Sequence, residues 1–337
     1  MKNLLRLMKT LFLFGIPFFV IAIIYVIEDP FMVIHNYKDF NSRFFIHKNR
    51  DFVSSEMYLR NSKKYDYDSF IFGSSTALYT SPSVWGEFIE HKGLIYSFDA
   101  SGENIAGVWS KIKFLNSSGC KINNALITID KSLFSTFVND NPVFMKHYGI
   151  YPSSKLSFHY TYFLHYLDIR FLLAWSHYGI SKKFYPYMKD ILDSKSYHYD
   201  TITNEYFNTG ILEELRTDSV AYYTRRLNRF PQRGGYYIEA DSVIDATESS
   251  MLKEIRSIFL ADSTNYRILI CPSFDQVAFN RRDKEILDAI FDSSNVFDFS
   301  GINSLTEEKS NFYDGLHFKK YVAKGMFQHM YNNKQDH

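Results

Sequence analysis

The stretch Ser69-Phe70-Ile71-Phe72-Gly73-Ser74-Ser75 shows how this chain of 337 residues is organised. An apolar run at 69–72 stops at a glycine and two serines, which predicts a buried strand followed by a sharp turn. Four further apolar runs stop in the same abrupt way: 94–98 before Asp99, 125–129 before Asp130, 267–271 before Pro272, and 296–299 before Ser300. The sequence therefore predicts five short strands.

Helix-like segments lie between these strands, at 105–116, 247–261 and 282–291. Strands that alternate with helices predict an α/β fold in which helices cover both faces of a parallel sheet. In such sheets, binding and catalytic residues gather at the carboxyl ends of the strands. The polar residues that follow the five strands are therefore the candidate site residues.

The N-terminal segment contains an apolar run at 11–27. As a helix its 17 residues would span roughly 26 Å, close to the ~30 Å of a bilayer core. A signal peptide has a shorter apolar region and a small-residue cleavage site, and residues 25–28 offer no such site. We therefore interpret residues 1–30 as an uncleaved membrane anchor. Its flanking charges predict a cytoplasmic N-terminus and an extracytoplasmic remainder: Lys2, Arg6 and Lys9 before the run, Glu28 and Asp29 after it.

The rest of the chain is expected to contain a stalk at 31–64 and one domain at 65–337. The interval between the third and fourth strands is too long for one crossover, which predicts an insertion at about 131–245. Dense apolar residues at 160–178 predict either a buried helix or a cap over the sheet edge. A second membrane span is disfavoured there because charged and polar residues interrupt the run: His165, Asp168 and Arg170.

Composition narrows the possible partners. With 38 basic against 37 acidic residues, the chain offers no strong field to nucleic acid. Aromatic residues make up 18% of the chain, and they either fill the core or provide stacking surfaces for a sugar. The two cysteines, Cys120 and Cys271, could form one disulfide, but free thiols are favoured because Cys271 lies in a predicted buried strand.

Two polar segments contain residues suited to nucleophilic catalysis. Ser74 and Ser75 follow the first strand, near helix-start amides that can stabilise a negative charge on a substrate oxygen. Asp314 and His317 share one loop just before a final helix predicted at 319–330. A serine needs a neighbouring base, and an imidazole held by a carboxylate is the usual one. The alternative interpretation is that Asp314 caps the final helix and His317 only packs.

Together these segments resemble the SGNH, or GDSL-like, hydrolase superfamily. That family places its serine after the first strand and an Asp-x-x-His sequence just before the last helix. The resemblance implies a flavodoxin-like sheet, with Ser75 as the nucleophile, His317 as the base and Asp314 as the carboxylate that orients it. It also implies an oxyanion hole formed by the amides of Ser75 and Gly102.

Among the branches of the superfamily, the chain looks most like the membrane-tethered DltD and alginate-acetylation type proteins. The resemblance covers residues 66–130 and 265–330 and leaves the insertion outside. It implies an extracytoplasmic O-acyl esterase or acyltransferase for acyl esters, above all acetyl esters, of a cell-envelope polysaccharide. It implies a multi-span membrane O-acyltransferase as a partner, and neither a metal nor another cofactor.

One position departs from the family's pattern. The third block usually provides an Asn as an oxyanion donor, whereas this chain has Asp130, whose charge would repel an oxyanion. Asp130 is expected to cap the following turn. Either another group replaces the missing donor, for which Lys131 and Asn104 are candidates, or activity is reduced. Ser74 is assigned to the turn after the first strand.

Two other classes of function follow from this departure and from the scattered histidines. One is an SGNH-fold protein without catalysis that binds a polymer or recruits a membrane partner. The other, a metal-dependent hydrolase, is disfavoured because the 11 histidines form no pair with ligand spacing near a strand end.

The charges around the apolar run generate a prediction of topology. A reporter enzyme that works only outside the cytoplasm should be active when it is fused after His337. The physical reason is that basic residues before the span stay on the cytoplasmic side. Activity of a cytoplasm-only reporter at the same position would contradict the predicted orientation.

Overall fold

The computed structural model of the protein describes residues 2–42, 46, 48–134, 141–189, 191–192 and 197–332. The chain divides into two compact units. The first, here called the helical unit, consists of Met1–Lys48 and Ser153–Lys195. The second, here called the sheet unit, consists of Asn49–Pro152 and Ser196–His337.

The segments expected as a stalk, 31–64, and as an insertion, 131–245, are each shared between the two units. Part of the expected stalk falls outside the described residues, namely 43–45 and 47. The same holds for part of the expected insertion, namely 135–140, 190 and 193–196.

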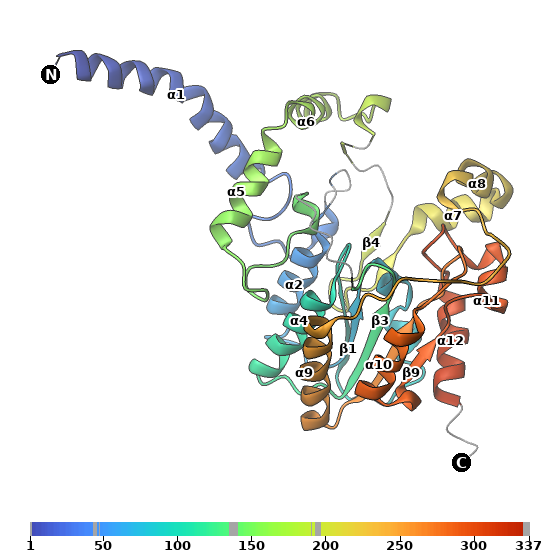
Figure 1. Cartoon of the computed structure of the whole chain (residues 1–337). Helices are drawn as coiled ribbons and strands as arrows, with labels where there is room; N and C mark the ends of the chain where they lie inside the picture. Colours follow the sequence, from blue (N-terminus) through green and yellow to red (C-terminus); the bar gives the residue numbers. More distant parts are fainter. Residues whose placement is uncertain are drawn as a thin grey trace. The chain divides into compact units, whose positions relative to one another are not determined.

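The helical unit contains α1 (Lys2–Glu28), α5 (Lys155–Tyr166) and α6 (Ile169–Ser181), with the short 3₁₀ helices η1 (Phe40–Ser42) and η4 (Pro186–Met188) (Figure 1). Within α1, Met8–Glu28 is long and apolar enough to cross a membrane, with a mean hydropathy of 2.6. The predicted N-terminal apolar helix is thus present.

A carboxylate just after α1 binds the backbone of the loop that follows this helix. Asp29 accepts hydrogen bonds from the amides of Val33, Ile34 and His35, each at 2.9 Å. In the last turn of α1, the Tyr25 ring packs against aromatic rings of α5. Residues at the C-terminal end of the apolar helix thus connect it to the rest of its unit.

Residues 160–178 do not form a buried helix, so this alternative was wrong. The carboxylate of Asp168 accepts from the Arg170 amide at 2.8 Å and so starts a second helix, α6, soon after α5 has ended. Apolar side chains on both helices are exposed, among them Leu156, Leu164 and Ile180. A polar break thus separates two helices that each leave apolar side chains uncovered within their unit.

The sheet unit is built on five parallel strands in the order β2-β1-β3-β7-β9 (Figure 1). They are β1 (Tyr67–Gly73), β2 (Leu94–Asp99), β3 (Asn124–Ile129), β7 (Asn265–Ile270) and β9 (Val296–Asp298). All five predicted strands are confirmed, and so is the α/β class. Because all five run the same way, their carboxyl ends meet at one edge of the sheet.

Four longer helices follow or precede these strands and pack on them: α2 (Arg50–Asn61), α4 (Ile105–Ser117), α9 (Ala246–Asp262) and α10 (Arg281–Phe291). The last helix is α12 (Lys320–Asn332). The helices predicted at 105–116, 247–261, 282–291 and 319–330 are thus confirmed, with ends that differ by one or two residues.

Alternate residues of β1 face different helices. The Phe70 ring contacts Tyr58 of α2, whereas Ile71 belongs to the core cluster that includes Val322 and Met326 of α12. This alternation follows from the two-residue period of a strand, which turns successive side chains to opposite faces. Both faces of β1 are consequently buried by helices.

The remaining elements of the sheet unit are short or peripheral. They are α3 (Pro82–Trp85), α7 (Thr209–Thr217), α8 (Ser219–Arg225), α11 (Ser304–Glu307), the strand pairs β4 (His198–Tyr199) with β5 (Tyr206–Phe207) and β6 (Ile238–Glu239) with β8 (Val277–Ala278), and the 3₁₀ helices η2 (Ser75–Tyr79), η3 (Pro142–Phe144), η5 (Leu227–Arg229), η6 (Ser293–Asn295) and η7 (Lys309–Asn311).

A buried ion pair ties α2 to the carboxyl end of β2. The Arg50 guanidinium donates to both carboxylate oxygens of Asp99, at 3.0 and 3.1 Å, and to Asn204 Oδ1 at 2.7 Å. The guanidinium also lies 3.4 Å from the centroid of the Tyr199 ring. Arg50 and Asp99 are almost fully buried, so each compensates the charge of the other where water cannot.

This pair generates a prediction of stability. Arg50→Met should cost about 3–5 kcal/mol of unfolding free energy, because it leaves the Asp99 carboxylate buried without a cation. The double variant Arg50→Met/Asp99→Leu should recover much of that loss, since both charges are then gone. Denaturation of the detergent-solubilised protein would measure both.

The matched control is Arg216→Met on α7, which removes an exposed arginine paired with Glu213. An exposed pair of this kind adds little to stability, so the control should unfold like the wild type. Equal losses for Arg50→Met and Arg216→Met would contradict the role given to the buried pair.

Candidate active site at the carboxyl edge of the sheet

Ser75 is positioned by the way β1 ends. Gly73 has φ +153°, and a Cβ at this position would lie 2.0 Å from Thr128 Oγ1 of β3, so only glycine fits. Ser74 then caps η2, its hydroxyl oxygen facing the Thr76 amide at 3.4 Å. Ser75 follows as the first residue of η2 and is half-buried at the sheet edge.

Asp314 and His317 lie on a tight loop between Phe312 and Phe318, which form an antiparallel bridge. The Tyr313 amide donates to the His317 carbonyl at 2.7 Å and closes the loop. Inside it, one oxygen of Asp314 accepts from the amides of Leu316 and His317, both at 3.0 Å. The loop thus holds the carboxylate in a fixed orientation.

The structure brings Ser75, His317 and Asp314 together, although Ser75 and His317 are 242 positions apart. Nε2 of His317 lies 2.9 Å from Ser75 Oγ. Nδ1 of the same ring lies 2.9 Å from each carboxylate oxygen of Asp314. A carboxylate beside Nδ1 favours the tautomer that carries its proton there, which leaves Nε2 free to accept the serine proton.

The charge state of Asp314 follows from its surroundings. Burial by itself would raise the pKa of Asp314, but the hydrogen bond and charge of His317, together with the two loop amides, outweigh it and leave the pKa below its usual value. Asp314 is therefore ionised at neutral pH and can stabilise an imidazolium at His317.

Sequence reasoning missed several residues that support this loop. The Tyr222 hydroxyl of α8 donates to the Tyr313 carbonyl at 2.8 Å, and the Tyr223 hydroxyl donates to the Phe312 carbonyl at 3.0 Å. The ring of Tyr79 lies 5.1 Å from the His317 ring. Because the chain is rich in aromatic residues, no sequence pattern distinguishes Tyr222 and Tyr223. Tyr79 could have been considered, since it lies close to Ser75 in the sequence.

Gly102 follows β2 in a turn with φ +58°. Gly73 pairs with Asp99 in the parallel register, and the Ala100 amide donates to the Gly73 carbonyl at 3.3 Å, so the loops after β1 and β2 are neighbours. Within the described part of the chain, the amides of Ser75 and Gly102 have no backbone acceptor. Both remain candidate donors to a substrate oxygen.

Ion pairs hold the loop that contains Gly102 from two sides. Asp99, at its start, is paired with Arg50. Glu103, which directly follows Gly102, is fully buried and accepts from Lys111 of α4 and from Lys146. The position of the Gly102 amide therefore depends on the ion pairs made by Asp99 and Glu103, which flank it in the chain.

Asp130 follows β3 and is saturated with donors. One carboxylate oxygen accepts from the amide and hydroxyl of Ser132, at 2.8 and 2.6 Å, so Asp130 caps the following turn as expected. The other oxygen accepts from the hydroxyls of Ser74 and Thr76, the latter at 3.1 Å. Asp130 therefore ties the end of β3 to the turn that carries Ser75.

The two candidate substitutes for the missing Asn have contacts of their own. The Asn104 side-chain oxygen accepts from the Gly107 amide at 3.0 Å and caps α4. The ammonium group of Lys131 is paired with Asp275. Neither residue is therefore aligned toward Ser75 by these contacts.

The described part of the chain shows no arrangement of side chains for a metal ion or a disulfide. No cluster of three or more His, Cys, Asp or Glu residues among the described positions is arranged to hold a metal ion. Cys120 and Cys271 are both free, and Cys120 is only half-buried.

Comparison with known proteins gives no family. The sequence matches no model of a known protein family and no curated protein. Any assignment of function therefore depends on the geometry of the Ser75, His317 and Asp314 side chains and on their surroundings.

The lowered pKa of Asp314 generates a prediction of pH dependence. A carboxyl group whose pKa is depressed by folding adds stability above its unfolded pKa of about 3.9, and this stability is lost as pH falls toward the folded value. Asp314→Asn should therefore be less stable than wild type near pH 7, and the gap should narrow below about pH 4. Thermal unfolding at several pH values measures it; a gap that stays constant would contradict the ionised state of Asp314.

Proposed function

We propose that this protein is a membrane-anchored serine O-acyl esterase or acyltransferase of the SGNH type, acting on acyl esters of a cell-envelope polysaccharide. The single observation that carries the proposal is the chain of contacts from Ser75 Oγ through His317 to the Asp314 carboxylate, each 2.9 Å long. Serine, imidazole and carboxylate in this order form the unit that activates a serine for acyl transfer.

The fold supports the same proposal. When its five strands are numbered in chain order, the sheet order β2-β1-β3-β7-β9 corresponds to the order 2-1-3-4-5 of flavodoxin-like sheets. The serine follows the first strand and the Asp-x-x-His loop precedes the last helix, as in the SGNH superfamily. Residues 131–245 are then an insertion in that fold.

The proposed mechanism begins with attack by Ser75 Oγ on the ester carbonyl carbon. His317 Nε2 takes the serine proton, and Asp314 stabilises the imidazolium that results. The amides of Ser75 and Gly102 donate to the tetrahedral oxyanion. As the ester bond breaks, His317 returns its proton to the leaving alcohol, and an acyl-enzyme remains on Ser75.

The acyl-enzyme is resolved by a second alcohol or by water. His317 takes a proton from that acceptor, which attacks the acyl carbon, and then returns the proton to Ser75 Oγ. Water as acceptor gives hydrolysis, and a sugar hydroxyl gives transfer. The same residues carry both reactions, so the acceptor that the site admits decides between them.

The location proposed for this reaction rests on α1. Its apolar helix would cross the membrane once with the N-terminus in the cytoplasm, and the sheet unit would lie outside. A polysaccharide of the cell envelope is accessible on that side. A multi-span O-acyltransferase in the same membrane is the proposed partner, on the strength of the family resemblance.

One observation favours a second function, that of a non-catalytic binding protein. Asp130 occupies the position of the usual Asn donor and brings a carboxylate close to the turn of Ser75 through Ser74 and Thr76. A negative charge there disfavours an oxyanion. A protein with this fold would then bind the polymer, or the membrane partner, without turnover.

The proposed mechanism generates a prediction for a set of variants. Ser75→Ala, His317→Ala and the double variant should all lose roughly four to six orders of magnitude in esterase rate and fall to the same level, because the residues act as one unit. Ser74→Ala is the matched control and should lose far less, since Ser74 serves the turn. Hydrolysis of 4-nitrophenyl acetate measures the rates.

Labelling with a serine-directed phosphonate separates the two functions. The probe should modify wild type at Ser75 and should not modify Ser75→Ala. Wild-type esterase activity that survives in Ser75→Ala would show that the nucleophile is wrong. No turnover and no labelling in wild type, together with retained polymer binding, would establish the binding protein instead.

A further inference from the structure

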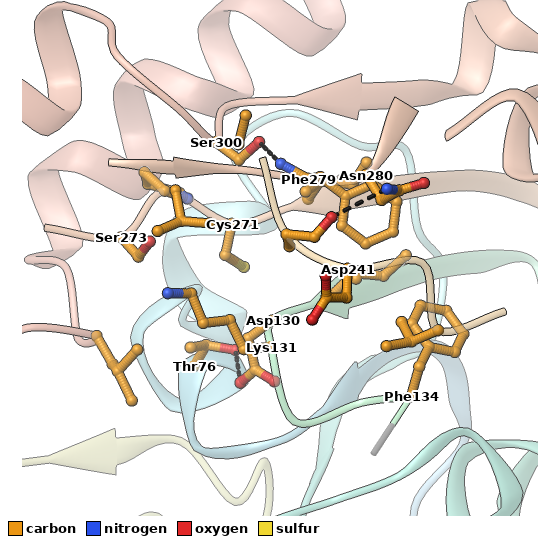
Figure 2. Close-up of a pocket in the computed structure, with 18 residues that line it drawn as sticks. Thr76, Asp130, Lys131, Phe134, Asp241, Cys271, Ser273, Phe279, Asn280 and Ser300 are labelled. Atoms are coloured by element: carbon orange, nitrogen blue, oxygen red, sulfur yellow. Dashed lines mark hydrogen bonds between the residues drawn. The ribbon is translucent and has the colours of Figure 1, made fainter. Parts of the chain in front are cut away.

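An apolar cavity of about 210 Å³ lies beside the proposed active site, between the carboxyl ends of β3 and β7 and the β6–β8 pair (Figure 2). Its walls are dominated by large apolar side chains, among them Ile129, Phe134, Val243, Ile270, Val277 and Phe279. A concave, mainly apolar site with few polar groups is the usual form of a small-ligand pocket.

The cavity adjoins both halves of the Ser75–His317 pair. Thr76, which directly follows Ser75, lines it, and so does Leu316, which directly precedes His317. Asp130 lines it as well and is hydrogen-bonded to Thr76, as Figure 2 shows. The cavity is therefore lined by sequence neighbours of both Ser75 and His317.

Several polar groups of the cavity have protein partners. Lys131 is paired with Asp275, and Ser300 Oγ accepts from the Phe279 amide at 2.8 Å. The side-chain amide of Asn280 donates to the Ala240 carbonyl at 2.9 Å. These groups have contacts of their own and do not require a polar ligand.

Cys271 also lines the cavity, and its thiol is no competing nucleophile. Burial, reinforced by the nearby charge of Asp130, raises the pKa of the Cys271 thiol far above its ordinary value. The thiol stays protonated and behaves as a small apolar side chain of the wall.

We propose that this cavity binds the acyl chain of the substrate, and that the chain is a linear apolar group of about six carbons or more rather than acetyl. The inference rests on the proposed function, since it takes Ser75 as the acyl acceptor. A protein cavity of about 150 Å³ lined by aliphatic and aromatic side chains is large enough for the six carbons of benzene. An acetyl group would leave most of the larger cavity without contacts.

The test is a series of 4-nitrophenyl esters from acetate to decanoate, hydrolysed by the full-length protein in detergent. Each methylene that enters the cavity should raise kcat/KM by up to about fourfold, until the cavity is full. Acetate as the best ester, or a series with no dependence on length, would overturn the proposal while leaving the esterase function intact.

Two cavity variants should change the length dependence in opposite directions. Val243→Trp places an indole on a partly exposed wall position, fills the cavity and should reduce the octanoate-to-acetate ratio to near one. Phe134→Ala removes a buried ring and should move the optimum to longer esters. The matched control is Val220→Trp, at an exposed valine of α8 outside the cavity, which should keep the wild-type ratio.

A binding measurement separates this inference from the proposed function. In the Ser75→Ala background, calorimetry should detect octanamide and not acetamide, with a negative heat-capacity change from apolar burial. Val243→Trp should abolish the octanamide signal. If wild type hydrolyses no ester, the proposed function fails, and this titration still decides the cavity: binding that Val243→Trp removes supports it, and no binding overturns it.

Discussion

At the end of β1, the backbone of Gly73 lies so close to Thr128 of β3 that no side chain fits between them. On its other side the same residue pairs with Asp99 of β2. This packing holds three strand ends together and forces the chain to turn away from the sheet immediately after Gly73. Ser75 follows this turn at the sheet edge, next to the loops after β2 and β3.

Next to this turn, buried ion pairs hold the backbone of the loop that contains Gly102. Arg50 holds Asp99, Lys111 and Lys146 hold Glu103, and Gly102 lies between the two anchored carboxylates. Such pairs add little net stability, because desolvation offsets most of their attraction. Their effect is directional, since a buried carboxylate that moves away from its cation leaves both uncompensated. The energetic cost of separating these buried charges therefore keeps the Gly102 amide in a fixed position.

Asp130 connects the turn of Ser75 with the apolar cavity. Its carboxylate accepts from Ser74, Thr76 and Ser132, so the charge is shared among hydroxyl and amide donors instead of being directed at a substrate. An Asn at this position would offer one donor to an oxyanion and would accept fewer hydrogen bonds from the turn. The chain thus combines a firmly held turn at Ser75 with a nearby carboxylate. In the proposed mechanism, the amides of Ser75 and Gly102 must therefore stabilise the oxyanion.

Local pattern by itself determined the five strands of the sheet, the N-terminal helix and the helices that pack on the sheet at 105–116, 247–261, 282–291 and 319–330. Five apolar runs that stop at glycine, proline or polar residues are strands, and the N-terminal run is one long apolar helix, because strand and helix formation depend on short-range periodicity. The Ser-Ser turn and the Asp-x-x-His loop could be chosen as candidates for the same local reason. No local pattern predicted the division into two units, with boundaries that include 48–49 and 152–153. The helix break at Asp168 within 160–178 was not predicted either. Only the tertiary structure decided that Ser75 meets His317, that Arg50 supports the loop of Gly102, that Tyr222 holds the loop of Asp314, and that Val243 and Phe134 line one cavity. These contacts join residues tens to hundreds of positions apart, and they form only when parallel strands bring their carboxyl ends to one edge.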